Sequence, residues 1–181
     1  LKHRPVEDKI LLTVTALAIL VIFPFLIASI QSQEKAAILI DLSAILGSSI
    51  IFSGVWYSNR VQFFSNLLAI FMQTLLVVAL HIEGASLIYW VFPIVIAGFY
   101  LLSSMVAILL NSLFITLACF ITYQQFDEFT LHRVVGALVL TNLFACALSM
   151  FMESKNRQLS EQDKINKVRN NILELIASSS K

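Results

Sequence analysis

The chain has 181 residues and a formal net charge of +1 at pH 7. Apolar side chains make up 59% of it and charged ones only 13%, which leaves too little polar surface to cover a soluble domain of this size. The sequence therefore predicts an integral membrane protein. Nucleic-acid binding is excluded as a predicted function, because there is no basic stripe or arm to neutralise phosphates.

Six stretches are apolar and long enough to cross a bilayer as helices. They cover residues 10–30, 36–57, 61–80, 87–102, 105–123 and 131–152. The segment 86–123 has no charged residue and is too long for one crossing, so we expect a helical hairpin with its turn near Ser103. The predicted fold class is all-α, a six-helix transmembrane bundle with a long cytoplasmic extension of the last helix.

Lysine and arginine are distributed unequally between the two predicted faces of the membrane. One face has Lys2, Arg4, Lys9, Arg60, Lys155 and Arg157, and the other has only Lys35 and Arg133. Because cytoplasmic loops carry the excess of basic residues, both termini are predicted to be cytoplasmic. We accordingly divide the chain into a cytoplasmic segment (1–9), a six-span membrane domain (10–152) and a cytoplasmic signalling helix (153–181).

Polar residues from four separate stretches are predicted to collect near the outer face. They are Asp41, His81, Glu83, Asp127, Glu128, His132 and Arg133. One hypothesis is an outward-facing ligand pocket bounded by the second, third and sixth spans, with Asp41, His81, His132 and Arg133 as its polar wall. Trp90 is a further candidate ligand-binding residue. The alternative is that these are interfacial residues that meet lipid headgroups.

Four amides lie deeper in the predicted spans, at Asn66, Gln73, Asn111 and Asn142. We expect them to form hydrogen bonds between helices, since an unpaired amide is unfavourable in lipid. A pocket for a quinone, lipid or fatty acid, lined by these amides and by phenylalanines, is the alternative. Two histidines without fixed spacing are a weak metal signal, so neither a metal nor another cofactor is predicted.

Nothing in the segment is typical of an enzyme, because it contains no phosphate-binding loop, nucleophile elbow or zinc-protease motif. Asp127, Glu128 and Phe129 match the end of a Gly-Gly-Asp-Glu-Phe cyclase signature. The two glycines that let the backbone approach phosphates are missing. We interpret the match as coincidence and predict that this segment is not catalytic.

No proline or glycine follows Gly136, so one helix is predicted to run from residue 131 to residue 176. Its polar part carries a short apolar seam with one slip in register, made by Leu159, Ile165, Val168, Ile172 and Leu175. This spacing favours a parallel coiled-coil homodimer. The alternative is an amphipathic helix that packs on a following domain.

Three short segments resemble a known family. They are Tyr-Trp-Val-Phe-Pro at 89–93, Phe-Tyr-Leu-Leu at 99–102 and Glu-Ser-Lys-Asn-Arg-Gln-Leu at 153–159. With the six-span layout, they resemble the membrane-associated sensor regions of bacterial diguanylate cyclases and cyclic-di-GMP phosphodiesterases. The segment 169–177 is similar to the helix that leads into a GAF domain in such proteins.

That resemblance implies a dimeric input module in the bacterial inner membrane. Its partners would be the lipid bilayer, a second copy and a downstream output domain in the same chain, of the GAF, GGDEF or EAL type. Two other functions stay open on the sequence. One is the input domain of a sensor histidine kinase, and the other is a small six-span transporter or membrane-embedded binding protein.

Overall fold

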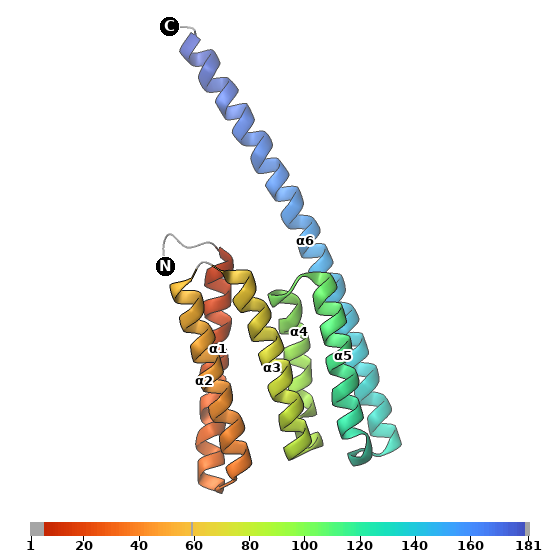
Figure 1. The fold of residues 1–181 in the computed structure, drawn as a ribbon. Helices are drawn as coiled ribbons and strands as arrows, with labels where there is room; N and C mark the ends of the chain where they lie inside the picture. Colours follow the sequence, from red (N-terminus) through yellow and green to blue (C-terminus); the bar gives the residue numbers. More distant parts are fainter. Residues whose placement is uncertain (1–5, 59, 180–181) are drawn as a thin grey trace.

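The computed structural model describes residues 6–58 and 60–179, with the side chains of 9–58, 60–170 and 172 (Figure 1). Its elements are α1 (Val6–Ser32), α2 (Lys35–Tyr57), α3 (Val61–Glu83), η1 (Ala85–Trp90, a 3₁₀ helix), α4 (Val91–Leu101), α5 (Ser104–Thr122), η2 (Tyr123–Gln125, also 3₁₀) and α6 (Glu128–Ser179). No strand occurs within the described ranges, which confirms the all-α class.

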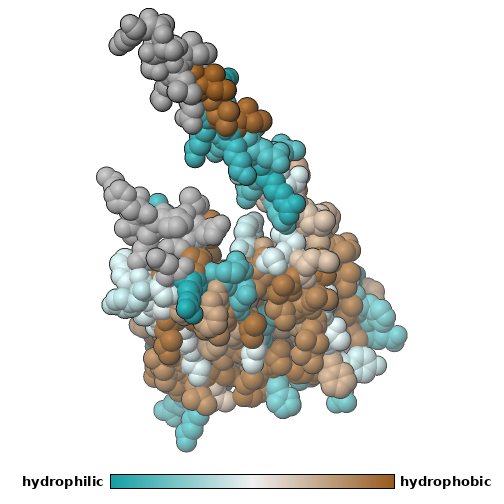
Figure 2. Space-filling model, turned by 45° about the horizontal axis from the view of Figure 1, so that its top comes forward, coloured by the Kyte–Doolittle hydropathy of each residue, from teal (hydrophilic) through white to brown (hydrophobic). Residues whose placement is uncertain are grey.

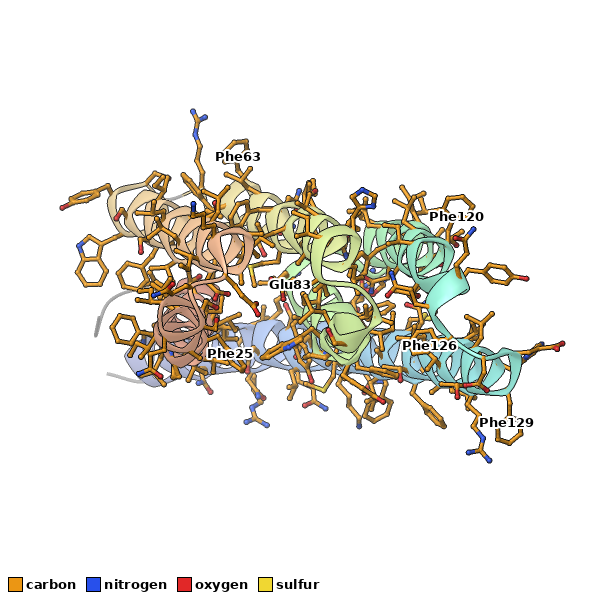
Figure 3. The ribbon with its side chains drawn as sticks, turned by 90° about the horizontal axis from the view of Figure 1, so that it is seen from below. Phe25, Phe63, Glu83, Phe120, Phe126 and Phe129 are labelled. Atoms are coloured by element: carbon orange, nitrogen blue, oxygen red, sulfur yellow. The ribbon has the colours of Figure 1, made fainter. Side chains whose placement is uncertain are left out.

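The helices form two rows. Viewed along the bundle, α2, α3 and α5 make one row and α1, α4 and α6 the other (Figure 3). Successive helices run in opposite directions, so the connections alternate between two ends (Figure 1). We call the end from which α6 projects the tail end, and the end that holds the α1–α2, α3–η1 and η2–α6 connections the far end.

Five of the described helices are long and apolar enough to cross a membrane, and Ala85–Leu101 is a shorter apolar helical segment. Exposed apolar side chains occur on every long helix and cover most of the face of the bundle seen in Figure 2, whereas the part of α6 that leaves the bundle is first polar. These features are those of a membrane protein. The six-span topology itself stays a prediction.

The fourth predicted span, 87–102, differs from the structure, which divides it into η1 and α4. Pro93 explains the break. It lies in the first turn of α4, where its missing N–H needs no helical partner, whereas a single α-helix through this region would place it in the interior. Gly84, at φ 84°, makes the sharp entry into η1.

Small residues let α2 approach α3 closely. A Cβ atom built on Gly47 would overlap Cζ of Phe71, and one built on Gly54 would overlap Cε1 of Phe64. A larger residue at either position would therefore displace the phenylalanine ring that packs against the glycine. The close helix packing expected from the small residues of the second span is present here.

A buried polar network joins three helices. Gln73 Nε2 on α3 donates to Asn111 Oδ1 on α5 at 2.8 Å, and Asn111 Nδ2 donates to the carbonyl oxygen of Val95 on α4 at 2.9 Å. The interhelical role expected of the deep amides is confirmed for these two. Asn66 instead accepts a hydrogen bond from Gln62 one turn away on α3, at 3.0 Å.

The expected continuous helix at the carboxyl end is confirmed, because α6 runs through 52 residues without a break. Asp127 caps its start, with Oδ2 accepting from the Thr130 backbone N–H at 3.0 Å. Hydrogen bonds from the Thr130 side chain and backbone hold the pKa of this carboxyl below its usual value. The coiled-coil pairing of the projecting part stays a prediction, and the Leu175 side chain lies outside the described ones.

Candidate functional site

A cavity of about 370 Å³ lies between α1 and α4, with α2 and α3 behind it. The α1 and α4 helices are neighbours in their row, yet their backbones stay apart (Figure 3). The α1 helix packs mainly on α2 and touches α3, whereas α4 packs on α3, α5 and α6. On α3 the lining extends from Leu68 to Glu83, roughly 22 Å at 1.5 Å per residue. The cavity is therefore long and narrow, and its volume is that of a small-molecule site.

Small side chains create the space. The alanines and glycine of the lining are Ala18, Ala37, Ala44, Ala69, Ala79, Ala97 and Gly98. On α1, Leu17, Val21 and Phe25 follow one another at one-turn spacing, and each is about half exposed, at 54%, 42% and 48%. Because these three line the cavity and also reach the surface of the bundle, the open side lies between α1 and α4.

The polar side chains of the cavity gather at the far end and come from three helices. Ser29 Oγ on α1 donates to Asp41 Oδ2 on α2 at 2.7 Å. Glu83, the last residue of α3, lines the same end and lies between the two rows of helices (Figure 3). Asp41 lies six residues inside α2, roughly 9 Å from its start, so its carboxylate is held within the apolar part of the bundle.

Two aromatic rings border this polar end. Phe25 on α1 and Trp90 on η1 meet edge to face, with ring centroids 5.4 Å apart and an interplanar angle of 83°. Both also line the cavity. This contact closes the gap between α1 and the α4 side at the far end, while the rest of the cavity wall is apolar.

Neither carboxylate of the cavity has a cationic partner among the described side chains. The ion pair found there joins Arg157 Nη2 to Glu153 Oε1 at 2.7 Å, on α6 at the tail end. Asp41 has its hydrogen bond from Ser29, but a carboxylate can accept several more. The far end of the cavity is thus acidic and retains hydrogen-bond acceptor capacity.

The structure brings together two of the five predicted ligand-binding residues, Asp41 and Trp90. His81 does not line the cavity and is exposed. It lies two positions before Glu83 on α3, and side chains two apart on a helix point in nearly opposite directions. Sequence reasoning noted Glu83 at the outer face but left it out of the pocket wall, since depth alone does not reveal which way a side chain points.

The other two predicted residues lie elsewhere on α6. His132 Nδ1 is 2.6 Å from the backbone oxygen of Glu128, and the Arg133 guanidinium lies 3.9 Å from the Phe129 ring centroid. The α6 helix packs on α4 and α5 rather than on α2. The expected pocket between the second, third and sixth spans is therefore wrong as a single site, because α3 and α4 separate α2 from α6.

The alternative pocket lined by deep amides is not the cavity either. None of Asn66, Gln73, Asn111 and Asn142 is among its lining residues. Asn111 approaches it from behind, since a Cβ built on the lining residue Gly98 would lie 2.7 Å from Asn111 Oδ1. The sequence signal that could have pointed to the cavity is the alanine content of the second, third and fourth spans.

No group of three or more His, Cys, Asp or Glu side chains in the described part of the chain is arranged to hold a metal ion. Comparison with known proteins adds no assignment: no protein-family model, curated protein or solved structure matches the chain. The geometry of the cavity and of α6 is therefore the basis for a functional proposal.

Proposed function

We propose that this chain is a membrane-embedded sensory input and dimerisation module that relays the occupancy of its cavity through α6 to a cytoplasmic signalling domain. The observation that carries the proposal is the continuity of α6. This helix packs in the bundle and then extends roughly 40 Å beyond Glu153 at 1.5 Å per residue. A rigid helix of this length transmits a shift or rotation at its base to its far tip.

The α4 helix supplies a route from the cavity to α6. Pro93, Ala97 and Leu101 of α4 line the cavity, and α4 also packs on α6. A ligand between α1 and α4 would press on a helix that α6 contacts directly. Because Asn111 on α5 donates a hydrogen bond to the Val95 carbonyl oxygen on α4, a shift of α4 would also displace α5, the α-helix that precedes α6.

A second contact lies where α6 leaves the bundle. Ser104 Oγ, at the start of α5, is 3.0 Å from Ser149 Oγ and 3.2 Å from Glu153 Oε2 on α6. Only Leu102 and Ser103 separate Ser104 from the end of α4. Movement of α4 along the bundle axis would therefore act on this hydrogen-bonded contact, and through it on the base of the projecting helix.

The finer features of the proposal come from the sequence. The basic residues favour six crossings with both termini cytoplasmic, and the seam of α6 favours a parallel homodimer. The family resemblance favours a bacterial inner-membrane location and an output domain that makes or breaks cyclic-di-GMP. A histidine-kinase output would use the same helix in the same way.

A second candidate function is favoured by the cavity itself. Because the open side lies between α1 and α4, a lipid-soluble molecule would enter from the bilayer, as in a small transporter or a membrane-embedded binding protein. Such a protein needs no mechanical role for the projecting part of α6. The two functions therefore differ in what a change to that helix should do.

The test is a fusion of this chain to a diguanylate cyclase domain that is active only as a dimer. One to four alanines are inserted after Ser160, each of which rotates the downstream domain by roughly 100°. We expect cyclic-di-GMP production to rise and fall with helical periodicity. The same insertions after Gln33, in the α1–α2 connection, serve as the control. Output that is insensitive to the insertions after Ser160 would contradict the proposal.

A further inference from the structure

The cavity has a chemical polarity that specifies its ligand. One end has Asp41, Glu83 and Ser29, and the remaining wall is apolar over most of the length of α3. A ligand that fills such a space needs one polar headgroup and one long, narrow apolar portion. A compact polar molecule would leave the alanine-lined part empty, and a wholly apolar one would desolvate the carboxylates without replacing their hydrogen bonds.

The charge and the aromatic side chains at this end of the cavity indicate the chemical class of the headgroup. Two carboxylates without a cationic partner among the described side chains favour a positive group and disfavour an anionic one. Phe25 and Trp90 border the same end, and aromatic rings attract ammonium groups through their negative faces. Carboxylates combined with aromatic rings are the side chains that bind alkylated ammonium groups best.

We propose that the cavity binds a single-chain cationic amphiphile, a long-chain ammonium compound, which enters from the bilayer between α1 and α4 with its headgroup at the far end. The inference names the ligand class of the site used in the proposed function, and rests on it only for the signalling consequence. The headgroup would contact Asp41 and Glu83, and the alkyl chain would lie along the alanines Ala69 and Ala97.

The test measures binding directly in nanodiscs of zwitterionic lipid. Trp56→Phe leaves Trp90 as the tryptophan reporter, because the chain has two tryptophans. An alkyl trimethylammonium ion brominated near its headgroup is titrated, and bromine quenches nearby indole fluorescence. We expect saturable quenching of Trp90. The alcohol and the sulfate of the same chain length should bind more weakly than the ammonium ion, by roughly tenfold or more.

Variants locate the headgroup. We expect Asp41→Asn and Glu83→Gln each to weaken binding of the ammonium probe by roughly tenfold or more. Ser29→Ala, which removes the hydrogen bond to Asp41 without changing a charge, should have a smaller effect. Glu128→Gln is the matched control, since this far-end acid does not line the cavity. Unchanged helical circular dichroism establishes that each variant folds.

Several results would overturn the inference. Equal quenching by the ammonium, alcohol and sulfate probes would identify nonspecific partition into lipid. Full binding to the Asp41→Asn and Glu83→Gln variants would remove the role of the carboxylates. The ligand and the signalling relay can fail separately. Specific binding that leaves cyclic-di-GMP production by the cyclase fusion unchanged would support the ligand and contradict the relay. Absence of specific binding, with output of the fusion that still varies with helical periodicity, would support the relay and contradict the ligand.

Discussion

At the scale of single residues, Asn111 joins three helices in the middle of the bundle. It is completely buried and bonds to α3 and α4 at once. Removing it leaves the Gln73 amide and the Val95 carbonyl without these bonds inside the bundle, and buried unpaired polar groups are destabilising. Its position behind Gly98 also places it against the cavity wall.

We predict that Asn111→Ala lowers the free energy of unfolding by about 1–3 kcal/mol. Reversible unfolding in mixed detergent micelles provides the measurement. Asn66→Ala is the matched control, because Asn66 bonds within its own helix and its loss should cost about 0.5 kcal/mol or less. Equal losses for the two variants would show that the network joining three helices adds no specific stability.

At the scale of elements, α6 is one helix with two parts that differ in composition and in packing. Its first part carries the buried residues Leu138 and Ala145 and packs in the bundle. Its projecting part is polar, with exposed apolar residues Leu159, Ile165, Val168 and Ile172. An exposed apolar seam of this kind favours pairing with another helix. The Glu153–Arg157 pair, one turn apart, supports the helix at the transition.

We predict that single cysteines at Val168 and Ile172 cross-link two copies of the chain efficiently under mild oxidation. Asn170→Cys is the control, because it lies on the opposite side of the helix from both seam positions. Cys119 and Cys146 are replaced by alanine in the parent. The measurement is the fraction of dimer on a non-reducing gel. Cross-linking of all three positions to the same extent would exclude a defined seam.

At the scale of the whole molecule, the two ends of the bundle differ in their ionisable residues. Among the described side chains, the tail end has four lysines and arginines, Lys9, Arg60, Lys155 and Arg157, together with Glu153. The far end has two, Lys35 and Arg133, together with Glu34, Asp41, Glu83, Asp127 and Glu128. The basic tail end is therefore expected on the cytoplasmic side. This orientation also places the projecting part of α6 where an output domain would be.

We predict that Gln33→Cys and Gln124→Cys, at the far end, react with a membrane-impermeant maleimide added to intact cells. Arg60→Cys and Lys155→Cys, at the tail end, should react only after the membrane is permeabilised. All four positions are exposed, so accessibility of the side chain is not limiting. Labelling of the tail-end cysteines alone in intact cells would show that the orientation is opposite to the predicted one. Labelling of cysteines at both ends in intact cells would contradict six crossings.

Much of the fold could be predicted from the sequence, and the exceptions have identifiable causes. The bounds of the apolar helices depend on local composition, so the first, second, third and fifth predicted spans coincide closely with α1, α2, α3 and α5, and the sixth lies within α6. The fourth differs because Pro93 and Gly84 divide it. The candidate site was predicted only in part: Asp41 and Trp90 belong to the cavity, whereas His81, His132 and Arg133 do not line it.

The sequence alone determined that this is an all-helical chain of long apolar helices, and that its last helix continues far past the apolar region, because composition and helical rise depend on each residue and its near neighbours. Only the tertiary structure decided that α6 lies beside α4 and α5, and that α1 and α4 stand apart around a cavity with an acidic end. The physical reason is that hydropathy reports how deep a residue lies. It does not report which way a helix is turned or which helix lies next to it, since side chains that face lipid and side chains that face the core are equally apolar.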